Sequence, residues 1–238
     1  TWIFCGDGDL EEGISHEACS LAGHLKLDKL VLFYDSNGIT IEGHTDLSVS
    51  DDPKKRFQSY NWHVLEIDGH DYDQIDRAIR KATKLAGKPV LIICKTHIGK
   101  GSPNKQDSHE AHGAPLGEEE VKLTKRALGM PEDQLFYIPQ EVTQLFEERA
   151  TKMKRAQGKW KRIFKEWSKA NPAKAEQWKA MHEDVLPADI EKLLPVFDPA
   201  KPVATRNASG LVLNALAQAM PGLVGGSADL APSNMTWL

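Results

Sequence analysis

Residues 1–8 read TWIFCGDG and residues 30–38 read LVLFYDSNG, and both are short apolar runs that stop at turn-forming residues. A continuous apolar run of strand length is typical of a strand that is buried on both faces. Between the two runs, apolar residues recur at the spacing of one helix face, at Ile14, Ala18, Leu21, Ala22 and Leu25. The order strand, helix, strand predicts parallel strands whose carboxyl ends lie at the same edge of a sheet.

The same alternation continues as far as residue 96. Residues 62–69 (WHVLEIDG) and 88–96 (KPVLIICKT) have the pattern of strands. Residues 71–87 between them have the pattern of a helix, with Gly87 placed to end it. We therefore predict an α/β fold, a parallel sheet flanked by helices, over residues 1–120.

The character of the sequence changes after Thr96. Residues 97–117 show no periodicity, and so long a loop in a compact domain is usually functional or disordered. Residues 118–181 are rich in Lys, Glu, Ala and Trp and predict helices. One helix face carries an aromatic and apolar stripe that we expect to pack against another element, namely Trp160, Ile163, Phe164 and Trp167.

A Pro-rich segment at residues 194–206 reads as a connector, and a further helical pattern follows it. We expect a first domain over residues 1–172, of which residues 121–172 are helical. Residues 173–238 are then the connector and the beginning of a second α/β domain.

Composition excludes several classes of protein. The formal net charge of −4 does not suggest a nucleic-acid-binding surface. Apolar runs stay far below the roughly 20 residues that a membrane crossing needs, so no membrane partner is expected. Three scattered cysteines without CxxC spacing, Cys5, Cys19 and Cys94, predict buried free thiols in the reducing cytoplasm rather than disulfides or a zinc site.

The Gly6-Asp7-Gly8 turn stands where ligands of parallel sheets usually bind. Glycines let the backbone approach a ligand closely, and a helix start suits a phosphate. A carboxylate beside a phosphate needs a divalent cation between them, so Asp7 suits Mg²⁺ bound to a diphosphate. Asn37 ends the next strand and offers an amide oxygen, with the Ile39 carbonyl two residues further on. We predict that these groups share one cation.

Gly-Asp-Gly followed thirty residues later by Asn resembles the motif of thiamine diphosphate-dependent enzymes. Within them, GDGDLEEGISHEACSLAGHLKLDKLVLFYDSNGITIEGHT at residues 6–45 resembles the transketolase family. So do GSPNK and SHEAHGAPLG at residues 101–117, and RNASG and GGSADLAPSN at residues 206–234. The resemblance implies the later part of a diphosphate-binding domain, followed by the start of a pyrimidine-binding domain.

The resemblance also implies roles for individual residues. Asp7, Asn37 and the Ile39 carbonyl would bind Mg²⁺, with Ca²⁺ as an alternative ion, and Gly8 and Asn37 would contact the diphosphate of the cofactor. His112 matches a histidine near both cofactor and substrate, where it can donate to phosphate or carry a proton. His97 and His109 carry no comparable match.

Two further positions match residues that hold the phosphate of a sugar substrate, Arg206 and Ser233, and both side chains suit phosphate oxygens. Glu12 and Glu17 lie on a helix that is near the subunit interface in the family, and Asp229 is expected near the cofactor. These roles predict sugar phosphate substrates and a homodimer.

The activity implied is transfer of a two-carbon ketol unit from a ketose phosphate to an aldose phosphate in the pentose phosphate pathway. We expect the chain to be a fragment that is inactive on its own. A deoxyxylulose-phosphate synthase-like enzyme and a non-catalytic interaction fragment remain alternatives. A dinucleotide-binding dehydrogenase is disfavoured, because Glu11 stands where the third glycine of its fingerprint belongs.

Overall fold

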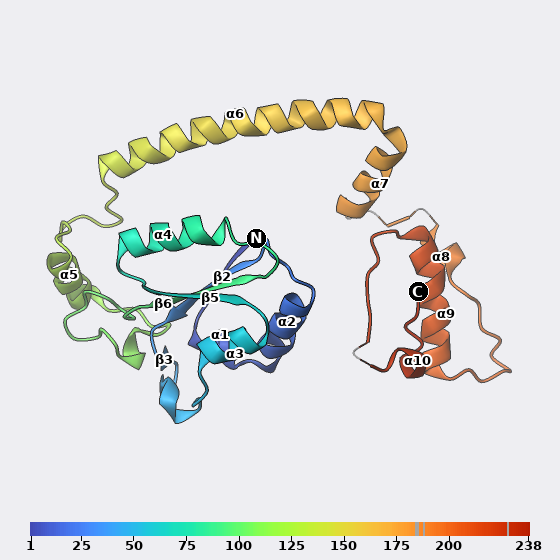
Figure 1. Cartoon of the computed structure of the whole chain (residues 1–238), viewed down its shortest axis with the longest axis horizontal. Helices are drawn as coiled ribbons and strands as arrows, with labels where there is room; N and C mark the ends of the chain where they lie inside the picture. Colours follow the sequence, from blue (N-terminus) through green and yellow to red (C-terminus); the bar gives the residue numbers. More distant parts are fainter. Residues whose placement is uncertain (184–185, 188, 228) are drawn as a thin grey trace. The chain divides into compact units, whose positions relative to one another are not determined.

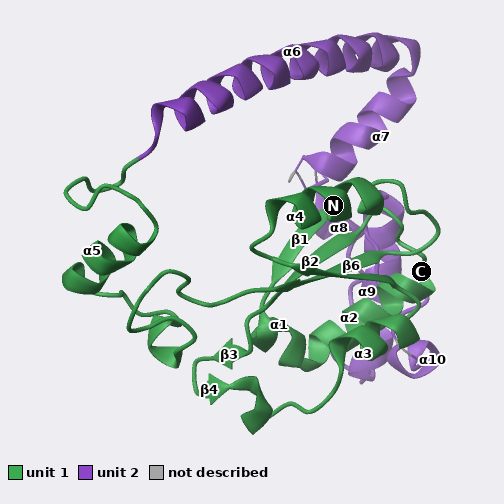
Figure 2. Cartoon of the chain, turned by 60° about the vertical axis from the view of Figure 1, so that its left-hand side comes forward, with its two compact units in different colours: residues 1–137 green, residues 138–238 purple. Residues whose placement is uncertain are grey.

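The computed structural model describes residues 1–183, 186–187, 189–227 and 229–238. The chain divides into two compact units, unit 1 at Thr1–Tyr137 and unit 2 at Ile138–Leu238 (Figure 2). Each unit is described by itself. The domain boundary expected near residue 172 stays a prediction.

Unit 1 is built on a four-stranded parallel sheet, which confirms the predicted fold class. Its strands lie in the order β1 (Trp2–Cys5), β2 (Val31–Ser36), β6 (Val90–Lys95) and β5 (His63–Asp68). Every neighbouring pair is parallel. The central strands β2 and β6 are almost entirely buried, as expected for apolar strands covered on both faces.

Helices cover both faces of this sheet (Figure 1). On one face lie α1 (Asp7–Glu11), α2 (Gly13–His24) and α3 (Pro53–Ser59), and on the other lies α4 (Tyr72–Ala82). The first face buries a core of Leu10, Ala22, Leu32, Tyr34, Phe57, Trp62, Leu91 and Ile93. The second buries Val31, Phe33, Ala78, Ala82, Val90 and Ile92.

The helices differ from expectation at three points. The helical pattern from Ile14 to Leu25 forms α2, but the short α1 before it was not expected, and the extended backbone of Glu12 separates the two helices. Helix α4 ends at Ala82 rather than Gly87, although Gly87 does adopt a positive φ of 78°. Helix α3 was not predicted, because it is short; Asp52 caps it by accepting a hydrogen bond from the Lys55 N–H.

The long loop predicted after Thr96 is confirmed. It contains only the short 3₁₀ helix η2 (His109–Ala111) before α5 (Glu118–Ala127). The buried Glu120 anchors it, accepting hydrogen bonds from the Ser102 hydroxyl and from the backbone and side chain of Asn104.

Three small elements lie between β2 and α3. They are the strands β3 (Ile39–Thr40) and β4 (Gly43–His44) and the 3₁₀ helix η1 (Thr45–Leu47).

The described part of unit 2 consists of helices: α6 (Gln140–Ala170), α7 (Pro172–His182), α8 (Ile190–Leu193), α9 (Thr205–Ala219) and α10 (Ala231–Asn234). The predicted packing of the aromatic stripe is found only in part: Phe164 stacks on Trp160 and Trp167 and contacts Trp178 of α7, whereas Trp160 and Ile163 are 54% and 58% exposed. In the described ranges, no helix combines the length and the apolar character that a membrane crossing requires.

Candidate functional site

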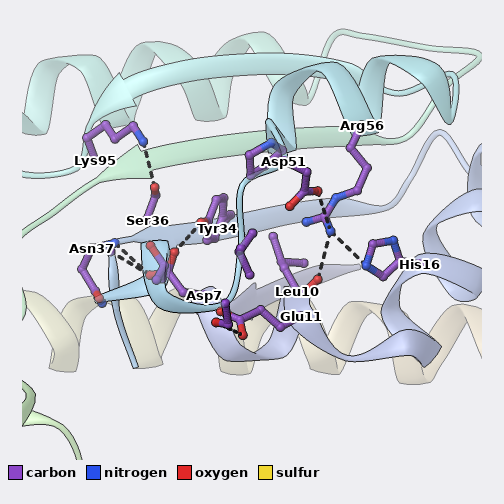
Figure 3. Close-up of a pocket in the computed structure, with 15 residues that line it drawn as sticks. Asp7, Leu10, Glu11, His16, Tyr34, Ser36, Asn37, Asp51, Arg56 and Lys95 are labelled. Atoms are coloured by element: carbon purple, nitrogen blue, oxygen red, sulfur yellow. Dashed lines mark hydrogen bonds and ion pairs between the residues drawn. The ribbon is translucent and has the colours of Figure 1, made fainter. Parts of the chain in front are cut away.

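The carboxyl ends of β1 and β2 meet at one edge of the sheet. Cys5 is the partner of Tyr34 in the parallel ladder, so the turn after β1 lies beside the turn after β2. A cavity of about 510 Å³ opens here, and Asp7, Tyr34, Ser36, Asn37 and Lys95 are among the residues that line it (Figure 3). The predicted meeting of Asp7 and Asn37 is therefore found in the fold.

Asp7 is buried, with only 7% of its surface exposed. Its Oδ1 accepts a hydrogen bond from the Tyr34 hydroxyl at 2.5 Å. Its Oδ2 accepts two backbone N–H groups, from Asn37 at 3.2 Å and Gly38 at 3.0 Å (Figure 3). Along the described chain, no lysine, arginine or histidine forms an ion pair with this carboxylate. A buried carboxylate without a cationic partner suits a bound cation.

The local sequence explains why Asp7 points into the cavity. Gly6 is the N-cap of α1, and its N–H donates to the Asp9 carboxylate at 2.8 Å. The Ser15 hydroxyl donates to the Asp9 carbonyl at 2.5 Å, which ties α1 to α2. Asp7 is the first residue of α1, so these contacts hold its backbone at the end of β1.

Asn37, Gly38 and Ile39 form the turn that faces Asp7. Asn37 Oδ1 accepts the Ile39 N–H at 2.9 Å, and this shapes the turn while leaving a second lone pair on the amide oxygen. Gly38 adopts a φ of 75°, which L side chains rarely accept. The structure thus brings the Asp7 carboxylate against the backbone of Asn37 and Gly38, and Asn37 lines the cavity with Asp7, whereas Ile39 is buried and is not among the lining residues.

Tyr34 and Lys95 were not singled out from the sequence. Burial, and then the hydrogen bond to Asp7, raise the pKa of Tyr34 well above its ordinary value, so its hydroxyl stays protonated and donates. Lys95 donates to the Ser36 hydroxyl at 2.9 Å and adds a positive charge to the cavity wall. Lys95 is a polar residue at the carboxyl end of a buried strand, and this signal could have identified it, whereas Tyr34 lies within β2 and carries no such signal.

The remaining predicted residues of unit 1 differ in position. Gly8 lies in α1 beside Asp7 and is exposed, and a Cβ built there would meet no atom within 4 Å. His112 is the exposed C-cap of η2 and does not line the cavity. The structure therefore brings Gly8 next to Asp7 and does not bring His112 into the cavity.

Arg206 and Ser233 belong to unit 2, where both are exposed, on α9 and α10 respectively. Asp229 of the same unit is also exposed. In unit 1, Glu12 is the exposed N-cap of α2 and Glu17 is exposed further along that helix. The roles expected of these residues stay predictions.

The loop histidines form no metal cluster. His97 contacts the Asp107 carboxylate through Nδ1 at 3.0 Å, and its ring stacks on that of His70. Within the ranges that the structure covers, no group of three or more His, Cys, Asp or Glu side chains could hold a metal ion. The Asp7 site is not such a group, because only one of its three predicted ligands is a carboxylate and the other two are an amide and a backbone carbonyl.

Comparisons with known proteins point to one family. The family described as "Transketolase, thiamine diphosphate binding domain" matches residues 1–187. Transketolase 2 of Escherichia coli is 50% identical over 243 aligned residues, which cover 99% of this chain and 36% of that protein. The transketolase of Bacillus subtilis is 44% identical, with 99% and 36% covered.

Solved structures give the same result. The transketolase of Leishmania mexicana superposes with a TM-score of 0.89 at 38% identity, and covers 100% of this chain and 35% of its own. The transketolase of Pichia stipitis in complex with sedoheptulose-7-phosphate has a TM-score of 0.88 at 39% identity, with 100% and 35% covered. The chain thus spans about a third of the length of its relatives. Matched by the family over residues 1–187 and aligned with transketolases along its whole length, the chain belongs to the transketolase family.

Proposed function

We propose that the cavity beside Asp7 holds the diphosphate of thiamine diphosphate through Mg²⁺, with Ca²⁺ as an alternative ion. Asp7, Asn37 and the Ile39 carbonyl are the proposed ligands of the cation, and Gly8 and Asn37 the contacts of the diphosphate. The observation that carries this proposal is the meeting of Asp7 with the Asn37–Gly38 turn. The ligands are oxygen atoms only, which are those that Mg²⁺ prefers.

The proposed reaction is transfer of a two-carbon ketol unit between sugar phosphates. Thiamine diphosphate, when bound, supplies the carbon nucleophile and the electron sink for such a transfer. In this proposal the chain's own residues bind and orient. His112 donates to phosphate or carries a proton, and Arg206 and Ser233 bind the substrate phosphate. Sugar phosphates are in keeping with the sedoheptulose-7-phosphate complex of the Pichia stipitis enzyme.

Further features are proposed on the family relationship alone. We place the activity in the cytoplasm and in the pentose phosphate pathway, and we expect the active protein to be a homodimer. Residues 1–238 alone are expected to lack the activity, because they correspond to only about a third of the transketolases that they match.

Binding can be tested on the chain itself by thermal unfolding with thiamine diphosphate, in the presence and absence of Mg²⁺. A ligand that binds only the native state stabilises it by about 2.7 kcal/mol at 100 times its dissociation constant. We expect stabilisation only when both components are present, and no effect of NAD. Asp7→Asn should abolish it. Asp35→Asn, on the opposite face of β2, should retain it. Stabilisation that persists in Asp7→Asn would contradict the proposed cation site.

Activity requires a longer protein than the isolated chain. In Transketolase 2 of Escherichia coli, the aligned segment can be replaced by residues 1–238, since the two are 50% identical over it. We expect the chimera to transfer ketol groups and the same chimera with Asp7→Asn not to. A folded chimera that binds thiamine diphosphate and Mg²⁺ but transfers nothing would favour a non-catalytic role for this chain.

A further inference from the structure

The Asp7 carboxylate is hydrogen-bonded unevenly. Oδ2 accepts the N–H groups of Asn37 and Gly38, whereas Oδ1 accepts only the Tyr34 hydroxyl. A carboxylate offers about four acceptor positions, two on each oxygen. Both positions on Oδ2 are therefore in use, and one on Oδ1 remains. A cation can bind Asp7 in this arrangement through Oδ1 alone.

Tyr34 holds that arrangement rigidly. The residue is 5% exposed, and its ring packs in the core with Leu10, Leu32 and Ile93. Its backbone lies between two parallel neighbours, Cys5 of β1 and Ile93 of β6. The hydroxyl–carboxylate distance of 2.5 Å is also the shortest of the three contacts to Asp7. The position of the hydroxyl, and with it the direction of Oδ1, is set by the core of the fold.

The two candidate ions differ in what they require of a carboxylate. Mg²⁺ demands near-ideal octahedral geometry at about 2.0–2.1 Å, whereas Ca²⁺ accepts one or both carboxylate oxygens at about 2.3–2.6 Å. We infer that Tyr34 is a positioning residue that holds Asp7 as a one-oxygen ligand and thereby favours Mg²⁺ over Ca²⁺. This inference rests on the cation site of the proposed function.

Removal of the hydroxyl shows how the preference arises. In Tyr34→Phe the ring still fills the core, but the Asp7 carboxylate is held through Oδ2 only. The terminal torsion of an aspartate is broad, so the carboxylate can then rotate, and a rotation that breaks one of the N–H contacts to Oδ2 makes both oxygens available to the ion. Ca²⁺ tolerates that change in ligation, and Mg²⁺ does not.

The test is titration calorimetry with Mg²⁺ and with Ca²⁺ on residues 1–238 in saturating thiamine diphosphate. In Tyr34→Phe we expect the Kd for Mg²⁺ to rise by about 10–100-fold, the usual effect of losing an outer partner of a metal ligand. The Kd for Ca²⁺ should rise by less, so the preference for Mg²⁺ falls. Tyr60→Phe is the matched control, because the Tyr60 hydroxyl bonds to His16 rather than Asp7. It should leave both constants unchanged.

Four results would overturn the inference. If Tyr34→Phe lowers the affinity for both ions by the same factor, Tyr34 has only a general structural role. If the affinities are unchanged, Tyr34 has no role in binding the ion. A folded wild-type chain that binds neither ion would overturn the proposed cation site as well. Circular dichroism checks that the variant is folded. If it is not, the infrared carboxylate stretches of the wild-type chain decide: one-oxygen ligation is expected with either ion, and a chelating signature overturns the inference.

Discussion

Arg56 Nη1 and His16 Nε2 lie 3.0 Å apart, and this contact determines which ring nitrogen of His16 carries the proton. A guanidinium can only donate, so His16 Nε2 is the acceptor and the proton lies on Nδ1. Nδ1 then donates to the Tyr60 hydroxyl, 3.0 Å away. The same Arg56 nitrogen donates to the Leu10 carbonyl of α1 at 3.1 Å and pairs with Asp51 at 3.2 Å. Arg56 therefore joins α1, α2 and α3 at the wall of the cavity beside Asp7 (Figure 3).

Arg56→Met is expected to destabilise unit 1 and to loosen α1. Hydrogen bonds involving charged groups contribute about 1.5–3 kcal/mol to stability, and the side chain is only 13% exposed. Chemical denaturation measures the loss, and hydrogen exchange of residues 7–11 localises it. Lys55→Met is the control, because Lys55 is 81% exposed and its ion pair with Asp52 should matter little. Equal effects of the two substitutions would show that the Arg56 contacts are dispensable.

The sequence predicts this edge of the sheet better than it predicts the cavity wall. The strands follow from unbroken apolar runs, and Asp7 and Asn37 follow from their places at the ends of two such runs. Arg56 and Tyr34 carry no such local signal. Arg56 is separated in sequence from Leu10 by 46 residues and from His16 by 40. Its contacts with them form only because α3 packs on the same face of the sheet as α1 and α2. Tyr34 looks like one more apolar residue of β2 until Asp7 is seen beside its hydroxyl.

Gly23→Ala is expected to be strongly destabilising. A Cβ at Gly23 would lie 1.8 Å from the Tyr60 carbonyl oxygen, so α2 and the end of α3 could not keep their present distance. Overpacking of this kind typically costs about 1–3 kcal/mol and occasionally more. Thermal unfolding measures the effect. Gly13→Ala, in the same helix but with no atom within 4 Å of the added Cβ, should be neutral or slightly stabilising. Similar melting temperatures for both variants would refute the close approach of the two helices.

Glu120 is expected to make the stability of unit 1 depend on acid pH. Hydrogen bonds from the Ser102 hydroxyl and from Asn104 hold the pKa of Glu120 below its ordinary value of 4.5. Because the folded-state pKa is the lower one, the stabilisation is fully present above pH 4.5 and is lost as the pH falls through the folded-state value. Glu120→Gln should lower the melting temperature at pH 7 and flatten its decline in acid.

The matched control for this substitution is Glu119→Gln. Glu119 is its neighbour in α5, and its side chain is 84% exposed. Glu119→Gln should leave the dependence of the melting temperature on pH close to that of the wild-type chain, because exposed ion pairs such as Glu119–Lys122 contribute little to stability. A Glu120→Gln profile that declines in acid as steeply as the wild-type profile would mean that other carboxylates dominate.

The three cysteines are expected to be unreactive in the native chain. Burial raises the pKa of Cys5 to about 12 and that of Cys94 to about 11, and it also raises the pKa of Cys19. Nearby carboxylates add to the effect, Asp9 at Cys5 and Asp35 at Cys94. Only the thiolate is nucleophilic, so the native chain should react slowly with a thiol reagent at pH 8 and faster as the pH rises towards 11. In denaturant the labelling rates of the three thiols should be alike. These rates should stop rising once the pH exceeds the ordinary thiol pKa of 9.0. Rapid labelling of the native chain at pH 8 would mean that the strand ends beside Asp7 open readily to solvent. In that case the amides of β1 and β2 should also exchange rapidly with solvent hydrogen.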